Sequence, residues 1–233
     1  MDRLGKRMAD KPVHRGHRSR LRKRFLDRGP GSLADYEMLE LLLFHANPRR
    51  DTKPIAKALL KRFGTYADVL RAGAGELQRV DGISEAGAVA LKSVADAAER
   101  LTRAEVMNRP VLAGWDALID YLRLSMTGYK TERFRILFLD VKNVLIADEL
   151  QQSGTVNHTP VYPREVVKRA LELGASAIIM VHNHPSGDAT PSRADVEITN
   201  EVRDAAAKLG ITLHDHVIVA RSGHTSFKSL GLL

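Results

Sequence analysis

Two histidines and an aspartate late in the chain have the types and spacing of ligands for one metal ion. His182 and His184 lie two residues apart, and Asp195 follows eleven residues after His184. Two imidazole nitrogens and one carboxylate oxygen form the protein ligand set of a catalytic zinc, whose fourth position is left to water. A structural zinc usually takes four protein ligands, most often thiolates, and the sequence has no cysteine. The pattern therefore predicts a hydrolytic centre.

The local sequence provides elements that can bring these three side chains together. Residues 176–181 are continuously apolar after Ser176, which is typical of a short strand covered on both faces. If that strand reaches His184, then His182 and His184 point to the same face, because strand side chains alternate. Residues 194–209 read as a helix with Asp195 in its first turn. A strand end and a helix start can thus converge on one ion.

A simpler interpretation exists for the residues at the start of this helix. Ser192 and Asp195 fit a capping box, in which the serine and the acidic side chain satisfy the free backbone N–H groups of the first turn. Asp195 also complements the helix dipole at that position. The capping box accounts for Ser192 and Asp195 and the helix dipole for Asp195, but neither explanation accounts for the two histidines that precede them. The combination favours metal ligands.

The ordered pattern resembles the JAMM motif of JAB/MPN-domain metalloproteases. It consists of His182-x-His184, seven further residues, and Ser192-x-x-Asp195. The surrounding residues 182–187 and 191–195 are similar to those of the RadC family of bacterial proteins. The resemblance covers essentially the whole chain. It implies a C-terminal α/β sandwich with a mixed sheet, of the MPN and cytidine-deaminase-like type, and Zn²⁺ held by His182, His184 and Asp195.

The JAMM resemblance also implies two catalytic residues that do not bind the metal. Its upstream glutamate matches Glu149 best, and a glutamate there can take a proton from water and pass it to the leaving nitrogen. Asp148 is the competing carboxylate, but strand alternation places it on the opposite face. By the same resemblance, Ser192 donates a hydrogen bond to the oxyanion. That role requires its hydroxyl proton to be free of the helix cap.

A second His-x-His pair, His214 and His216, lies in an apolar segment near the C-terminus. No carboxylate follows it at a comparable spacing, and Asp215 is expected on the other face of that strand. We interpret the pair as structural, or as a support for the ligands of the metal.

The positive charge of the protein is confined to its first half. Residues 1–110 contain 23 Lys and Arg against 14 Asp and Glu, whereas residues 111–233 contain 13 against 14. The excess is densest at residues 15–24. Such a run is either a solvated helix face or an arm that binds the phosphates of nucleic acid by displacing counterions.

The first half also reads as short helices, at about residues 18–28, 34–45, 52–63 and 85–103. Residues 77–86 resemble a helix-hairpin-helix, whose glycine-containing turn offers backbone N–H groups to a DNA phosphate. Ser84 stands where the family pattern usually has a second glycine, and serine approaches a phosphate less closely. A protein-binding or purely structural hairpin therefore remains an alternative.

The second half predicts the order helix, strand, strand, helix, strand, helix, strand. The first helix spans residues 115–126, the strands 134–140 and 144–149 follow, and residues 165–173 form the next helix. We therefore expect a small all-α helix-hairpin-helix-like domain at residues 1–105 and a JAB/MPN-like α/β domain at residues 106–233. The boundary is placed where the helical pattern gives way to Asn108-Arg109-Pro110.

Two functions from different classes follow from these features. The first is a zinc-dependent hydrolase of peptide or isopeptide bonds with a peptide or protein substrate. The second is a DNA-binding protein associated with DNA repair, in which the metal domain is accessory. A nucleobase deaminase would use a cysteine-rich zinc site, and the chain has no cysteine. No apolar run reaches membrane-spanning length and no signal peptide is evident, so we expect a cytoplasmic protein without a membrane partner.

Overall fold

The computed structural model describes residues 16–107, 109–153 and 161–233, and the chain divides into two compact units. The units are Met1–Ala95 and Asp96–Leu233. The helix Glu85–Met107 (α6) runs across this division. The boundary that the sequence predicts between residues 105 and 106 therefore stays a prediction.

The first unit is helical, as the sequence predicts. Its helices are α1 (His17–Arg28), the 3-10 turn η1 (Pro30–Ser32), α2 (Asp35–Ala46), α3 (Lys53–Phe63), α4 (Tyr66–Arg71), α5 (Ala74–Leu77) and the first part of α6. Leucines at helical spacing form its core, among them Leu39, Leu43, Leu59 and Leu91, all fully buried. The short helices α4 and α5 were not predicted, because four to six residues carry too little periodicity.

Helix α1 contains most of the basic run, and part of that run is structural. The Arg18 guanidinium donates hydrogen bonds to backbone carbonyls at and beyond the end of α2, those of Phe44, Asn47, Pro48 and Arg50. It therefore caps α2, whose last carbonyls lack helical partners. Arg24 pairs with Glu37 of α2, and Leu21 is buried. Arg15 lies outside the described residues, which leaves Arg20, Arg22 and Lys23 as the exposed cations of the run.

The turn between α5 and α6 is a tight hairpin. Gly82 has φ +90°, and a Cβ there would lie 2.8 Å from Cδ1 of Ile55, so both the backbone conformation and the space require glycine. The Ser84 Oγ accepts a hydrogen bond from the Gly87 N–H at 3.3 Å. Ser84 thus caps the start of α6, the role expected of a serine that replaces the second glycine.

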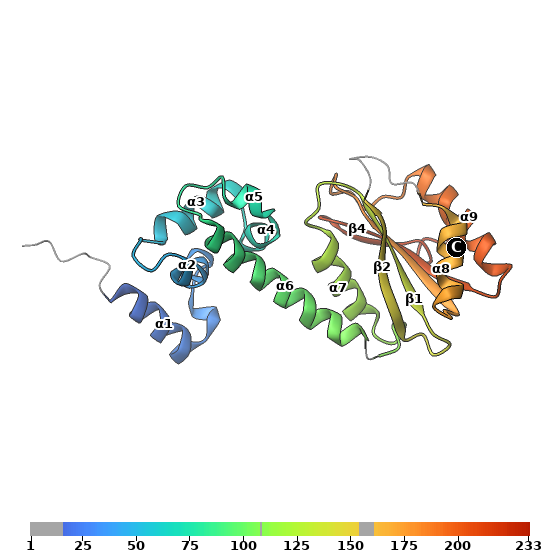
Figure 1. Ribbon diagram of the computed structural model, residues 1–233, viewed down its shortest axis with the longest axis horizontal. Helices are drawn as coiled ribbons and strands as arrows, with labels where there is room; N and C mark the ends of the chain where they lie inside the picture. Colours follow the sequence, from blue (N-terminus) through green and yellow to red (C-terminus); the bar gives the residue numbers. More distant parts are fainter. Residues whose placement is uncertain (1–15, 108, 154–160) are drawn as a thin grey trace, which may run out of the picture. The chain divides into compact units, whose positions relative to one another are not determined.

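The second unit contains a five-stranded mixed sheet in the order β2-β1-β3-β4-β5 (Figure 1). The strands are β1 (Arg133–Leu139), β2 (Leu145–Ser153), β3 (Ala177–Asn183), β4 (Thr212–Ala220) and β5 (Gly223–Ser226). Among the strands that the structure describes, only β3 and β4 pair in parallel, and helix α9 (Arg193–Ala207) connects them. The α/β fold class with a mixed sheet is confirmed. Strand β5 was not predicted.

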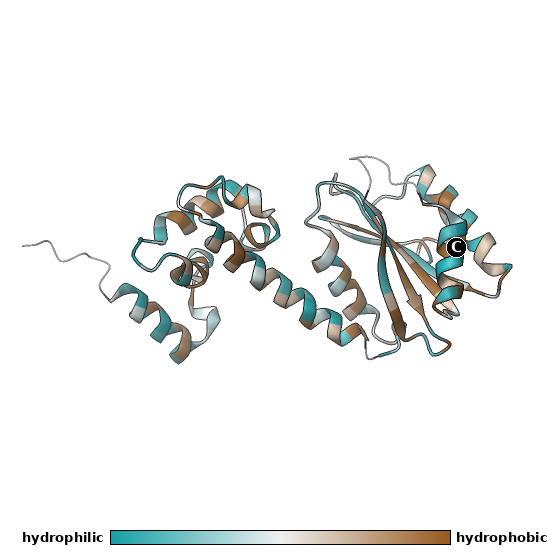
Figure 2. Cartoon of the chain, viewed as in Figure 1, coloured by the Kyte–Doolittle hydropathy of each residue, from teal (hydrophilic) through white to brown (hydrophobic). Residues whose placement is uncertain are grey.

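Helices cover both faces of the sheet. Helix α7 (Trp115–Met126) packs on one face, and α8 (Pro163–Glu172) packs with α9 on the other (Figure 1). Alternate residues of β3 enter the two cores, with Ile179 on the α7 face and Ile178 and Met180 on the α8–α9 face. This explains why the segment is apolar throughout instead of alternating. Figure 2 shows the resulting hydrophobic strands between helices that carry hydrophilic outer faces.

A buried charged cluster joins α7 to the sheet. Arg135 of β1 donates hydrogen bonds to Asp148 of β2 at 3.2 Å and to the Tyr121 hydroxyl of α7 at 3.2 Å. Tyr121 itself donates to Asp148. Burial, followed by the Asp148 charge, raises the pKa of Tyr121 to about 12. Asp148 therefore has a structural role on the α7 face, on the opposite side from Glu149, as alternation predicts.

Replacing Asp148 with alanine should destabilise this unit strongly. The variant leaves the Arg135 charge, whose side chain is 19% exposed, without its carboxylate. Removing one partner of such a buried pair costs about 3–5 kcal/mol. Asp120→Ala, at an exposed position of α7, is the matched control and should change the free energy of unfolding by less than about 0.5 kcal/mol. Guanidinium denaturation measures both; equal midpoints for the two variants would show that the cluster adds no stability.

Within residues 16–107, 109–153 and 161–233, no helix combines the length and the apolar character needed to cross a membrane.

Candidate metal centre

His182 lies on the α8–α9 face of the sheet, near the end of β3. It pairs with Phe134 of β1, and the two rings stack with centroids 5.5 Å apart and an interplanar angle of 6°. The imidazole is fully buried. Because β3 and β4 are parallel, this end of β3 is where open α/β sheets usually bind ligands. The sequence therefore places a polar ring at the end of a buried strand where such sheets usually bind a ligand.

His184 follows directly after the last residue of β3. Its N–H still donates to Val219 of β4 at 3.0 Å, so the ladder continues to this position. Its ring Nδ1 lies 2.8 Å from the carbonyl oxygen of Asp188. The loop that makes this contact turns at Gly187, whose φ of +92° favours glycine. The loop thus orients the second imidazole through a backbone acceptor.

Asp195 lies in the first turn of α9, behind the N-cap Ser192. One carboxylate oxygen, Oδ2, accepts hydrogen bonds from the Ser192 N–H and hydroxyl, both at 2.7 Å. The Ser192 Oγ in turn accepts from the Asp195 N–H at 3.2 Å. The capping box expected from the sequence is therefore present. It fixes Asp195 with its other oxygen, Oδ1, directed towards His182.

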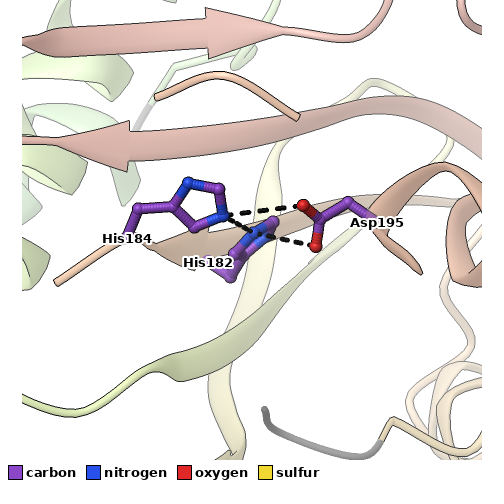
Figure 3. Close-up of side chains that lie close together, drawn as sticks. All are labelled: His182, His184 and Asp195. Atoms are coloured by element: carbon purple, nitrogen blue, oxygen red, sulfur yellow. Dashed lines mark hydrogen bonds and ion pairs between the residues drawn. The ribbon is translucent and has the colours of Figure 1, made fainter. Parts of the chain in front are cut away.

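The three side chains meet at one point, as Figure 3 shows. The Nε2 atoms of His182 and His184 lie 2.9 Å apart. Asp195 Oδ1 lies 3.2 Å from Nε2 of His182, and Oδ2 lies 3.5 Å from Nε2 of His184. One ligand atom from each residue falls within 4.8 Å of the others. The residues come from a strand, the loop that follows it and a helix start, and together they could hold a metal ion.

The hydrogen bonding of the imidazoles fits a cation at this point. The Asp188 carbonyl can only accept, so the neutral His184 ring carries its proton on Nδ1 and presents a lone pair at Nε2. A carboxylate and an unprotonated ring nitrogen that face each other need a shared cation or a proton. Burial opposes ionisation of Asp195. The hydrogen bonds that its carboxylate accepts from His182 and then His184, when these rings are protonated at Nε2, nevertheless hold the pKa of Asp195 well below its usual range. The hydrogen bond to Asp195 correspondingly raises the pKa of His184.

Glu149 lies on the same face of the sheet as His182 but is engaged by another residue. It pairs with Ile136 of β1, which in turn pairs with Met180 of β3. The Arg169 guanidinium of α8 contacts both of its carboxylate oxygens at 2.7–3.1 Å. This hydrogen bonding lowers the pKa of Glu149. In the described part of the chain, the group of possible ligands holds His182, His184 and Asp195 but not Glu149.

The Ser192 hydroxyl donates its proton to Asp195 in this structure. A serine in this state cannot donate to a substrate oxyanion, because a hydroxyl has one proton. Its role as an oxyanion donor therefore stays a prediction, and it requires rotation of the hydroxyl away from Asp195.

The second His-x-His pair is separated by a bulge in β4. Leu213 pairs with Ile178 and Asp215 with Ile179, which leaves His214 as the extra residue. His214 contacts Asn143 at 2.6 Å, in the turn between β1 and β2. His216 is fully buried and lies 2.8 Å from the Nδ1 of His182. The two alternatives therefore apply to different residues. His214 has the structural contact, and His216 has the contact with the possible ligand His182.

Sequence reasoning missed two polar side chains that contact Glu149 or His216. Arg169 binds Glu149, and Thr199 of α9 lies 2.5 Å from His216. Thr199 lies four residues after Asp195, one helical turn further on the same face, and this spacing was the available signal. Arg169 lies on a helix of mixed charge, where nothing local singles it out.

Two family models match the chain. The model described as RadC-like JAB domain matches residues 112–232, just over half of the chain. The model described as UPF0758 N-terminal matches residues 15–89. The first match contains all three possible ligands together with Glu149 and Ser192. The second contains α1–α5 and the hairpin.

Proposed function

Because the chain belongs to the RadC-like JAB domain family, we propose that it is a zinc-dependent hydrolase of peptide or isopeptide bonds. The observation that carries the proposal is the convergence of two imidazole Nε2 atoms and one carboxylate within 4.8 Å. Three protein ligands of this type leave a position open, which distinguishes catalytic zinc sites from structural ones.

In this proposal, His182, His184 and Asp195 hold the metal. When bound, zinc would lower the pKa of water and polarise the scissile carbonyl. The sheet supplies the two imidazoles from one strand end, and the helix N-terminus supplies the carboxylate. The surface beside the loop is hollowed and lined by Ser186, Gly187, Asp188, Arg221 and Ser222.

Glu149 is the proposed acid/base. Its carboxylate would take the proton of the attacking water and deliver it to the leaving nitrogen. The contact with Arg169 favours the deprotonated form that the first step needs. Its side chain is 30% exposed, and that of Arg169 is 40% exposed. Both can therefore rearrange at the surface when substrate binds. Ser192 is the proposed oxyanion donor, once its hydroxyl turns from Asp195.

Nucleic-acid binding by the helical first unit, in a protein associated with DNA repair, is the alternative function and stays a prediction. Arg18 and Arg24 of the basic run are engaged within the unit, which reduces the charge available to phosphates. The hairpin has glycine only at Gly82, with Ser84 as the cap of α6. The cytoplasmic location also stays a prediction.

Metal removal tests the hydrolase proposal. The native protein is incubated with a peptide library and with isopeptide-linked model substrates, and cleavage is followed by mass spectrometry. We expect cleavage that stops after treatment with a chelator and returns on addition of one equivalent of Zn²⁺. A zinc-loaded, folded protein that cleaves no member of either set, or cleavage that survives complete metal removal, would contradict the proposal.

A further inference from the structure

A buried histidine supports the metal centre from behind. His216 has no solvent exposure and lies between two aromatic rings, with Phe227 at 4.6 Å and Phe134 at 5.5 Å between ring centroids. An imidazole in such a place must satisfy both of its nitrogens, because an unpaired buried polar atom is costly. Its Nε2 lies 2.8 Å from Nδ1 of His182, and its Nδ1 lies 2.5 Å from the Thr199 hydroxyl oxygen.

The contact of Thr199 with the Asp195 carbonyl determines which group donates in each hydrogen bond of this chain. The Thr199 hydroxyl lies 2.5 Å from the backbone carbonyl of Asp195, which can only accept. Thr199 therefore donates there, and its oxygen accepts from Nδ1–H of His216. The neutral His216 ring then has a bare Nε2, which accepts from Nδ1–H of His182. Each contact becomes a hydrogen bond in this arrangement, whereas reversing the chain places two acceptors 2.5 Å apart at Thr199.

We propose that His216 and Thr199 are positioning residues, which fix His182 in the tautomer that carries its proton on Nδ1 and presents Nε2 to the metal. The proposal rests on the metal site of the proposed function but not on hydrolysis. In this proposal, His216 affects the metal only through its hydrogen bond with His182.

The two imidazole ligands are thus oriented in different ways. His184 uses a backbone carbonyl in the exposed loop, and its side chain is 17% exposed. His182 is oriented by a buried chain of hydrogen bonds through His216 and Thr199, which ends at the backbone carbonyl of Asp195. Helix α9 therefore supplies one ligand through the side chain of Asp195 and, one turn later, anchors another through Thr199. Metal ligands of this kind lose about 10–100-fold in metal affinity when the group that orients them is removed.

Zinc affinity of four variants tests the proposal. His216→Leu removes the acceptor for His182 at similar volume, and we expect zinc affinity to fall about 10–100-fold. His216→Gln can present its amide oxygen near the position of Nε2 and should stay within about threefold of the native protein. Thr199→Val removes the hydroxyl and should weaken binding, whereas Thr199→Ser retains it and should not. Competition with a chromophoric chelator at pH 7.5 measures affinity, and circular dichroism checks the fold.

Nitrogen-15 NMR of the metal-free native protein above pH 8 reads the tautomer directly, without zinc or substrate. We expect a proton on Nδ1 of His182, donated to an unprotonated Nε2 of His216. An unprotonated Nδ1 of His182 overturns the proposal. Native zinc affinity in folded His216→Leu also overturns it, and if that variant does not fold, native affinity in Thr199→Val does so. If the native protein cleaves nothing but these variants still lose zinc affinity, the positioning role would be supported and hydrolysis rejected.

Discussion

The Glu149→Gln variant should bind zinc as the native protein does and lose about 10²–10⁴-fold in kcat on any peptide that the native protein cleaves. Glutamine keeps the size of the side chain but cannot take a proton from water, and general acid–base catalysis contributes an effect of this order. Zinc binding should persist because Glu149 lies outside the group of three possible ligands. Steady-state kinetics and the amount of bound zinc are both measured on the same sample.

Glu172→Gln is the matched control for this substitution. Glu172 lies on α8 and contacts the same guanidinium, with its oxygen 3.0 Å from Nη1 of Arg169. It lies one turn from Arg169 with its side chain 45% exposed. Both variants therefore remove one carboxylate from Arg169, but only one removes the proposed base. Full turnover in Glu149→Gln, or equal losses in the two variants, would show that Glu149 is not the acid/base.

The possible ligands could be predicted because the information is local. The strand β3, the loop with Pro185 and Gly187, and the capped start of α9 occupy one short stretch of sequence. The alternation of a strand and the position of an N-cap place the side chains without knowledge of distant contacts. The opposite placement of Asp148 and Glu149 follows from the same alternation.

Contacts between distant segments were beyond such reasoning. The Glu149–Arg169 pair joins an edge strand to a helix twenty residues later. The approach of His216 to His182 depends on the pairing of β3 with β4 and on the bulge at His214. Arg18 belongs to a run that predicts a solvated helix face or a phosphate-binding arm, but it binds carbonyls at and beyond the end of α2, 26–32 residues away. Register and docking decide these contacts, and neither has a local signature.

The second large effect concerns the metal itself. We expect the native protein to bind one Zn²⁺ per chain and the His184→Ala variant to bind none after dialysis, because two remaining ligands do not make a zinc site. His224→Ala, which removes an exposed histidine of β5, is the matched control and should bind zinc as the native protein does. Retention of stoichiometric zinc by His184→Ala would mean that the ion lies elsewhere.

Zinc affinity should also fall as the pH is lowered, because a proton on His184 competes with the metal. An imidazole must be deprotonated to bind metal, and the pKa of His184 in the metal-free protein is raised by Asp195. A proton therefore competes with zinc from a pH above the ordinary histidine value of about 6.5. Between pH 7.5 and 5.5, His184 alone should reduce affinity by about tenfold or more. Glu149, whose pKa is lowered, stays ionised across this range, so the acid loss of activity should follow metal release.

Elemental analysis of the folded, zinc-saturated and dialysed native protein at pH 7.5 tests the account most directly. The account predicts one zinc per chain, retained by His224→Ala and lost from His184→Ala. A correctly folded native protein that holds no stoichiometric divalent ion under these conditions would contradict it.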